Sequence, residues 1–175
     1  HADDSRIFVI PSAPGRRFDG DTKVTDLLYK MADLAREKQD FSEVLQQIRE
    51  RFEEIIEGLG MQDFSLEDQF AEIEKQMREA PDADYAASRG EHLNGRIMAA
   101  YLGYSFVDPY EMIFFDEEGM LEDRRTMRAV EKRLAQEEYA VIPGFYGRGH
   151  DGRVKTFSRG GSDVTGSIVA GACHA

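Results

Sequence analysis

The chain has 175 residues, of which 41% are hydrophobic and 32% are charged, and its formal net charge is −12 at pH 7. This length and this share of apolar residues fit one globular domain with a sizeable core rather than a disordered chain. The acidic balance argues against non-specific nucleic-acid binding, because a phosphate backbone attracts clustered Lys and Arg side chains. A local basic pocket for a small anion remains compatible with it.

Signals for export or membrane insertion are missing from the sequence. There is one cysteine, Cys173, so no intrachain disulfide can form, which fits a reducing compartment. No apolar run approaches the ~20 residues that span a bilayer, and the first ten residues lack the regions of a signal peptide. We expect a cytoplasmic protein with no membrane partner. The missing initiator Met and the strand-like and helix-like ends also lead us to expect a fragment of a longer protein.

The N-terminal part predicts a strand, a loop and a helix. Residues 6–10 (RIFVI) are a β-rich run closed by Pro11, which is typical of a buried strand. Residues 11–20 hold two prolines and two glycines and therefore predict a loop. Asp21 is expected to cap the helix that follows, whose apolar residues recur at helical spacing.

Residues 40–81 are expected to form a charged, antiparallel helical hairpin. The first helix carries an apolar stripe that ends near Gly58 and Gly60. Residues 65–68 (SLED) are typical of a capping box and predict the start of the second helix, which Pro81 ends. The charged residues of both helices are interpreted as solvated faces.

The second half alternates helices with short strands, which argues for an α/β domain with a mainly parallel sheet. We expect a helix over 88–103, two β-like runs within 105–115, a turn at 116–119, a helix over 126–138, a strand at 139–142, a loop over 147–152, a strand at 153–157 and a final helix.

Four segments are candidates for a binding site. In open parallel sheets, ligands bind beyond the carboxyl ends of the strands, where loops and helix N-termini gather. Three segments follow predicted strands and the fourth lies at a predicted helix start: residues 11–15 (PSAPG), 143–147 (PGFYG), 158–163 (SRGGSD) and 88–91 (SRGE).

Residues 158–163 allow two interpretations from pattern alone. Gly160 and Gly161 let the backbone turn its N–H groups toward one point, and Arg159 adds a bidentate donor suited to a carboxylate. Ser162 or Asp163 is expected to cap the next helix, whose N-terminus favours an anion. The segment is therefore either an ordinary capped loop or an anion site.

Residues 88–91 also leave two interpretations open. Ser88 with Glu91 is typical of a capping box, although the same carboxylate can bind a substrate ammonium group. His92 and His150 are expected at the surface or in loops, and no cluster has zinc-ligand spacing. The sequence contains no P-loop motif and no partners for a hydrolase triad at Ser12.

Taken in order, these segments resemble the aspartate kinases of the amino acid kinase family. The likeness rests on VIPSAPG (9–15), KVTDLL (23–28), SRGE (88–91), PGFYG (143–147) and SRGGSD (158–163), and it covers nearly the whole chain. The last motif resembles the family's Gly-Arg-Gly-Gly-Ser-Asp signature, with Ser158 in place of the first Gly. The resemblance implies a partial amino acid kinase catalytic domain over residues 1–175, an αβα sandwich that is incomplete here and that contains the helical hairpin.

The resemblance also implies transfer of the ATP γ-phosphoryl group to the β-carboxylate of L-aspartate, the first step toward lysine, threonine and methionine. Its substrate residues, carried over by motif, are Ser12, Thr25, Glu91, Phe145, Arg159, Gly160, Gly161 and Ser162. Glu91 is expected to hold the ammonium group and Arg159 a carboxylate. Ser12 and Thr25 are expected at aspartate and the phosphoryl end, with Arg159 and Asp163 as catalytic residues.

The nucleotide half of such a site is missing from the sequence. The family's Lys-Phe-Gly-Gly and Thr-Asp-Val-Asp-Gly segments, which bind ATP, do not occur here. The resemblance implies ATP and Mg²⁺ as cofactors and a homo-oligomer at full length, yet this chain alone is expected to be inactive. Alternatives are a kinase for another small acidic acceptor, of the glutamate or carbamate type, or a non-catalytic binding module.

Overall fold

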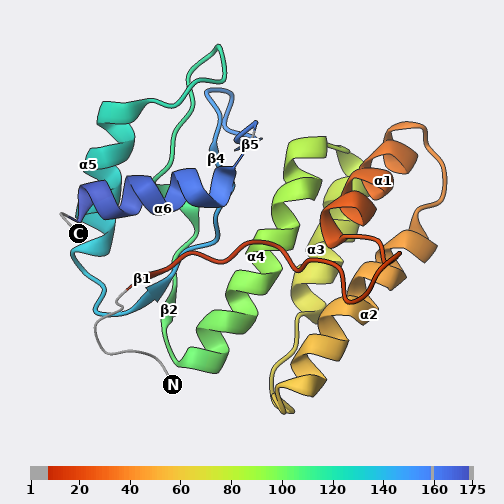
Figure 1. Cartoon of the computed structure of the whole chain (residues 1–175). Helices are drawn as coiled ribbons and strands as arrows, with labels where there is room; N and C mark the ends of the chain where they lie inside the picture. Colours follow the sequence, from red (N-terminus) through yellow and green to blue (C-terminus); the bar gives the residue numbers. More distant parts are fainter. Residues whose placement is uncertain (1–7, 159, 174–175) are drawn as a thin grey trace.

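The computed structural model describes residues 8–158 and 160–173. One long helix, α4, divides the molecule (Figure 1). Helices α1, α2 and α3 pack on one side of it, and the strands with α5 and α6 lie on the other. The helices are α1 (Val24–Arg36), α2 (Ser42–Gly58), α3 (Glu67–Glu79), α4 (Ala83–Leu102), the 3₁₀ turn η1 (Pro109–Glu111), α5 (Asp123–Leu134) and α6 (Gly161–Ala172).

Three short parallel strands form the sheet in the order β1-β3-β2. They are β1 (Phe8–Val9), β2 (Ser105–Phe106) and β3 (Ala140–Val141), and β3 lies between the other two. Residues of β3 are fully buried, as expected for a central parallel strand covered by helices. The predicted α/β class with a mainly parallel sheet is confirmed.

The predicted strand at residues 153–157 exists but lies outside this sheet. It forms β5 (Val154–Thr156), which pairs antiparallel with β4 (Tyr146–Arg148) in a separate ribbon. The predicted loop from Gly147 to Gly152 was therefore wrong for Gly147 and Arg148, which belong to β4. Gly147 packs against Ile113, where a Cβ would lie 2.5 Å from the Ile113 carbonyl oxygen, so this strand needs a glycine that sequence pattern alone assigns to a turn.

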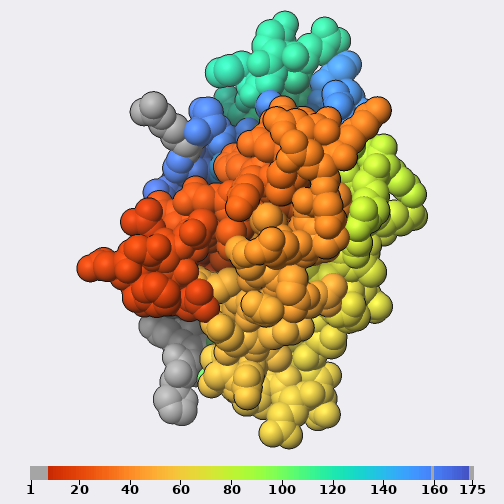
Figure 2. Space-filling view, turned by 90° about the vertical axis from the view of Figure 1, so that its right-hand side faces the viewer, coloured from red at the N-terminus to blue at the C-terminus, as the bar shows by residue number. Residues whose placement is uncertain are grey.

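The hairpin of α2 and α3 is present and packs on α1 and α4. The rings of Phe52 and Phe70 lie 6.2 Å apart between the two helices, and Arg49 forms an ion pair with Glu67. Buried apolar residues from α1 to α4 form one core, and the sheet with α5 and α6 encloses a second. Figure 2 shows the loop after β1 together with α1 and α2 covering one face of the molecule.

Two predicted N-terminal caps were wrong. Helix α1 begins at Val24 without a side-chain cap, because Asp21 instead accepts hydrogen bonds from Arg17 and pairs with the buried Arg51. Helix α3 begins at Glu67, one residue later than a capping box with Ser65 as N-cap requires. The Ser65 hydroxyl accepts a hydrogen bond from the Glu67 N–H at 3.2 Å.

Helix α4 begins five residues earlier than predicted. Asp82 caps it by accepting a hydrogen bond from the Tyr85 N–H at 2.8 Å. Ser88 is therefore inside the helix, where its hydroxyl donates to the Tyr85 carbonyl, and the capping-box interpretation of Ser88 and Glu91 was wrong. Among the described helices, none is long and apolar enough to cross a membrane.

Candidate acceptor-binding site

Glu91 is a buried carboxylate with an unsatisfied oxygen. It lies in the middle of α4, its residue is 6% exposed, and its Oε2 atom has no hydrogen-bond partner among the described residues. Burial raises the pKa of Glu91 from 4.5 to about 7, although the Ala13 N–H lowers it in part. A buried, unpaired acceptor is costly, so this atom is suited to a cationic or hydrogen-bonding ligand.

The loop after β1 lies directly on this part of α4. A Cβ at Gly90 would be 2.8 Å from the Ala13 Cβ, so the loop approaches the helix through the space that glycine leaves. The Asn94 side chain donates to the Ser12 carbonyl at 2.7 Å. Ser12 is exposed, and its hydroxyl is therefore available at the edge of the site.

The loop after β3 meets the same place from the sheet. The Gly144 N–H donates to the Pro11 carbonyl at 3.2 Å, which joins the loops after the neighbouring strands β1 and β3. A Cβ at Gly95 would lie 2.6 Å from Pro143, so α4 also packs closely on this loop. Phe145 has a φ of 83°, a conformation that is strained for a non-glycine residue.

The N-terminus of α6 packs against the loop after β3. A Cβ at Gly161 would lie 2.6 Å from the Phe145 Cα, and a Cβ at Gly144 would lie 2.6 Å from the Ser162 Cα. The Phe145 N–H donates to the Thr165 hydroxyl at 3.2 Å. These close backbone contacts bring the free N–H groups at the start of α6 to the loop that follows β3.

The predicted cap of α6 was wrong. Gly160 takes the N-cap position with a φ of 55°, and neither Ser162 nor Asp163 supplies a side-chain cap. Ser162 and Asp163 both lie in the first turn, and Asp163 is exposed. The left-handed φ explains why this position carries a glycine, since it avoids the Cβ clash that other residues meet there.

The structure brings together Glu91, the loops that carry Ser12 and Phe145, and the N-terminal turn of α6 with Gly161 and Ser162. Thr25 lies half-buried in the first turn of α1, next to Val24, which contacts the Gly90 position. Gly160 precedes α6 and is exposed. Arg159 lies outside the described residues.

A buried polar cluster beside the site was not predicted. His92, expected at the surface, is 7% exposed and lies between the Tyr146 hydroxyl at 3.0 Å and Asp108. Burial lowers the pKa of His92 to about 4. Once α4 is extended back to Asp82, helical spacing puts His92 on the face of Tyr85 and Arg89, and that is the signal that could have revealed its burial. His150, also expected in a loop, is exposed as predicted.

The carboxylates of the described residues form no three-ligand metal cluster. Within residues 8–158 and 160–173, no three His, Cys, Asp or Glu side chains are placed to hold one ion.

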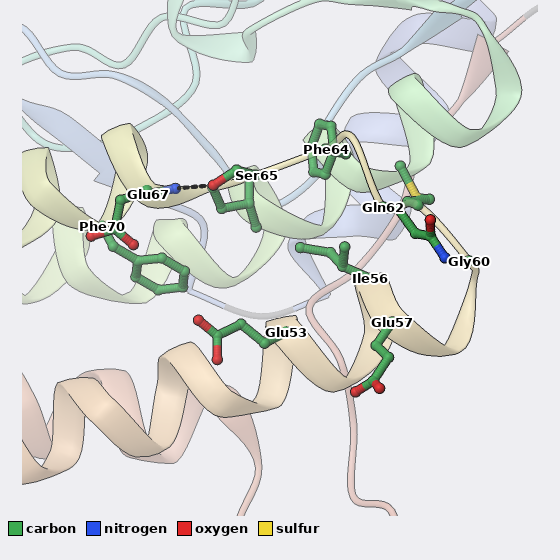
Figure 3. Close-up of a pocket in the computed structure, with 11 residues that line it drawn as sticks. Glu53, Ile56, Glu57, Gly60, Gln62, Phe64, Ser65, Glu67 and Phe70 are labelled. Carbon is green, nitrogen blue, oxygen red and sulfur yellow. Dashed lines mark hydrogen bonds between the residues drawn. The ribbon is translucent and has the colours of Figure 1, made fainter.

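A cavity of about 410 Å³ lies far from these residues, at the tip of the helical hairpin (Figure 3). Apolar side chains that include Ile56, Phe64 and Phe70 form its walls, and Glu53 and Glu57 stand at its edge. None of the predicted site residues that the structure describes lines it. The candidate site rests instead on Glu91 and the loops around it.

A sequence profile described as the Amino acid kinase family matches residues 1–175. The chain belongs to the amino acid kinase family. It is 33% identical to Aspartokinase 3 of Bacillus subtilis (strain 168), an alignment that covers 99% of this chain and 41% of that protein. A relative of this chain within the amino acid kinase family is therefore an aspartokinase.

Solved structures of amino acid kinases agree with this fold. The crystal structure of Clostridium acetobutylicum aspartate kinase matches with a TM-score of 0.94 and 42% identity over 99% of this chain and 40% of that one. E. coli aspartokinase III, solved in complex with aspartate and ADP, matches with a TM-score of 0.62 and 20% identity, over 99% of this chain and 41% of that one, and shows the fold alone. The chain thus spans about two fifths of the length of these relatives.

Proposed function

We propose that this chain is the acceptor-binding part of an aspartate kinase, an enzyme that transfers the γ-phosphoryl group of ATP to the β-carboxylate of L-aspartate. The observation that carries the proposal is the buried Glu91 carboxylate with its unpartnered oxygen. The aspartokinase of B. subtilis and the aspartate kinase of C. acetobutylicum, similar over 99% of the chain, support it. The full-length protein that carries this chain is called the parent protein below.

Glu91 is proposed to bind the ammonium group of aspartate. An ammonium group donates to the Oε2 atom, which has no partner among the described residues, and supplies a positive charge in addition to the Ala13 N–H. Glutamate at this position thus favours an amino acid over a simple dicarboxylate. Arg159, by resemblance, would bind a carboxylate of the same substrate.

The N-terminal turn of α6 is proposed to face the negative end of the substrate. Backbone N–H groups at Gly161 and Ser162 belong to the first turn of a helix, where the dipole favours an anion. The Phe145 main chain packs on the same turn, where its N–H donates to the Thr165 hydroxyl and its carbonyl accepts from the Phe157 N–H. The second lone pair of this carbonyl is proposed to contact the substrate. Ser12 and Thr25 are proposed to contact aspartate and the phosphoryl group, and Asp163 to orient polar neighbours.

The chemistry asked of these residues is positioning and charge stabilisation. A β-carboxylate oxygen of aspartate forms a bond to the γ-phosphorus while the bond from that phosphorus to the β,γ-bridging oxygen breaks, giving aspartyl phosphate and ADP. The nucleophile is already ionised, so no general base is needed. Fixing the acceptor in line with the nucleotide supplies most of the rate enhancement.

The chain alone is expected to be inactive, because the segments that resemble the family's ATP site do not occur in it. Incubated with aspartate, ATP, Mg²⁺ and hydroxylamine, the 175-residue chain should form no aspartyl hydroxamate, whereas the parent protein should form it. Hydroxamate production by the isolated chain would contradict this division of the site. A parent protein that forms none with aspartate would refute the proposed function.

Aspartate binding should depend on pH through Glu91. The folded pKa of Glu91, about 7, lies above its ordinary value of 4.5, so the carboxylate becomes protonated and loses its attraction for ammonium as pH falls through 7. The KM for aspartate should therefore rise about tenfold from pH 8 to pH 6 and stay nearly flat above pH 8. Initial-rate kinetics check this, and a Glu91→Gln variant should show no such pH dependence.

Two alternatives remain to be tested. A related kinase could use glutamate, and calorimetry on the parent protein with aspartate and glutamate separates the two, since tighter glutamate binding would exclude the aspartate assignment. A non-catalytic module would use the charged hairpin as a partner surface. In that case Arg159→Ala and Glu91→Ala would leave turnover and aspartate affinity unchanged. A homo-oligomeric parent protein in the cytoplasm stays a prediction.

A further inference from the structure

A continuous hydrogen-bonded chain crosses from α4 to the ribbon beside the site. The Arg96 Nε lies 3.2 Å from the His92 Nε2, the His92 Nδ1 lies 3.0 Å from the Tyr146 hydroxyl oxygen, and that oxygen lies 2.9 Å from Asp108 Oδ1. Tyr146 is fully buried and His92 nearly so. The acceptor chemistry described above assigns no role to any of these four side chains.

The direction of every hydrogen bond in this chain is fixed. An arginine can only donate, so the His92 Nε2 accepts from Arg96. Burial alone would raise the pKa of Asp108, but its hydrogen bonds with His92 and the Tyr110 N–H lower it, so Asp108 is a carboxylate that accepts the Tyr146 proton. The His92 Nδ1 must then carry the imidazole proton, which it donates to the Tyr146 oxygen at 3.0 Å, with Asp108 Oδ2 farther away at 3.5 Å.

The two central residues of the hydrogen-bonded chain, His92 and Tyr146, are adjacent in sequence to Glu91 and Phe145 of the acceptor site. His92 follows Glu91 in α4, and Tyr146 follows Phe145, whose φ of 83° is strained. A strained backbone persists only where the surroundings hold it. The hydrogen-bonded chain links the helix that carries Glu91 to the loop that carries the Phe145 main chain. These elements also meet where Pro143 packs on Gly95 and where Arg89 stacks on the Tyr146 ring.

We propose that the Tyr146 hydroxyl, held between His92 and Asp108, is a positioning group that fixes the Phe145 main chain relative to Glu91 for binding of the amino acid acceptor. The inference rests on the proposed function. Tyr146 touches no substrate in this account. It acts through Phe145 and α4, and it therefore governs acceptor binding rather than nucleotide binding.

The test removes this hydroxyl alone. In the parent protein, Tyr146→Phe keeps the aromatic ring under Arg89 but removes the hydroxyl at the centre of the hydrogen-bonded chain. We expect the KM for aspartate to rise about tenfold while the KM for ATP stays within about twofold, since only the acceptor half of the site loses its geometry. A purely structural role would lower the melting temperature without separating the two KM values.

Tyr110→Phe is the matched control. The Tyr110 hydroxyl donates to the Gly152 carbonyl at 2.6 Å, in the turn of the same ribbon. The Tyr110→Phe variant therefore loses one tyrosine hydrogen bond that is not part of the hydrogen-bonded chain through His92. An active parent protein in which Tyr146→Phe and Tyr110→Phe give equal KM values for aspartate would overturn the inference and leave the proposed function intact. A wild-type parent protein without aspartate kinase activity would overturn both.

The proton positions can be checked independently of activity. Nitrogen-15 NMR of histidine-labelled parent protein at pH 7 should find neutral His92 with its proton on Nδ1. A His92 protonated on Nε2 would contradict the direction of the hydrogen-bonded chain and with it the inference.

Discussion

The Glu91→Gln variant of the parent protein is expected to lose affinity for aspartate by about 100-fold while its KM for ATP stays unchanged. Glutamine keeps the shape of the side chain but removes the negative charge that faces the ammonium group. Truncating one partner of a buried, hydrogen-bonded charge pair costs about 2–5 kcal/mol of binding, and 100-fold lies within that range. Initial-rate kinetics with each substrate varied in turn measure both KM values.

Glu57→Gln is the control for this change, because Glu57 is an exposed carboxylate at the hairpin cavity, away from the site. It should leave both KM values at wild-type levels. Equal KM values for aspartate in Glu91→Gln and wild type would show that Glu91 does not bind the acceptor.

Glu91→Gln should weaken aspartate binding but raise the free energy of unfolding above pH 7. The pKa of Glu91 is raised on folding from 4.5 to about 7, so ionisation above pH 4.5 favours the unfolded chain. The penalty grows as pH rises from 4.5 to 7 and then stays constant, and the shift corresponds to about 3 kcal/mol. Relative to Glu91→Gln, the wild type should lose unfolding free energy over this interval, as denaturant titrations at pH 5 and pH 8 would measure.

Gly161→Ala is expected to lower kcat/KM for aspartate about 100-fold and the unfolding free energy by about 2 kcal/mol. The added Cβ would meet the Phe145 Cα at 2.6 Å, and a backbone atom cannot swing aside as the end of a side chain can. The start of α6 and the already strained Phe145 would have to separate. Kinetics and thermal unfolding of the parent protein measure the two effects.

Gly166→Ala provides the matched control in the same helix. Nothing lies within 4 Å of its added Cβ, so alanine should stabilise α6 by up to about 1 kcal/mol through its higher helix propensity and leave aspartate kinetics unchanged. If Gly161→Ala behaved like Gly166→Ala, the close packing of α6 on Phe145 would have no part in the site.

Local pattern predicted most of the fold because each element carries its own signal. The apolar stripe of α2 and the buried run at β3 were both identified from periodicity and β-branched residues. Helix starts were less predictable. Asp21 has the chemistry of a cap, yet its carboxylate pairs with Arg51, thirty residues away, and that partner is set by tertiary packing rather than by sequence spacing.

The candidate site was only partly predictable from the sequence. Motif resemblance singled out Glu91, but its interpretation as half of a capping box depended on a helix start that Asp82 in fact provides. The burial of Glu91 and the orphaned Oε2 arise from the loop after β1 lying on α4, a long-range contact. The hydrogen-bonded chain through His92 and Tyr146 joins residues 54 positions apart and has no local sequence signature.

The central claim, that Glu91 binds the ammonium group of an amino acid acceptor, is tested most directly by calorimetric titration of the parent protein with aspartate and with succinate, which lacks the ammonium group. The account predicts that the wild type binds aspartate about 100-fold more tightly than succinate, and that Glu91→Gln abolishes most of this preference. Equal affinity of the wild type for the two dicarboxylates, or an undiminished preference in Glu91→Gln, would contradict it.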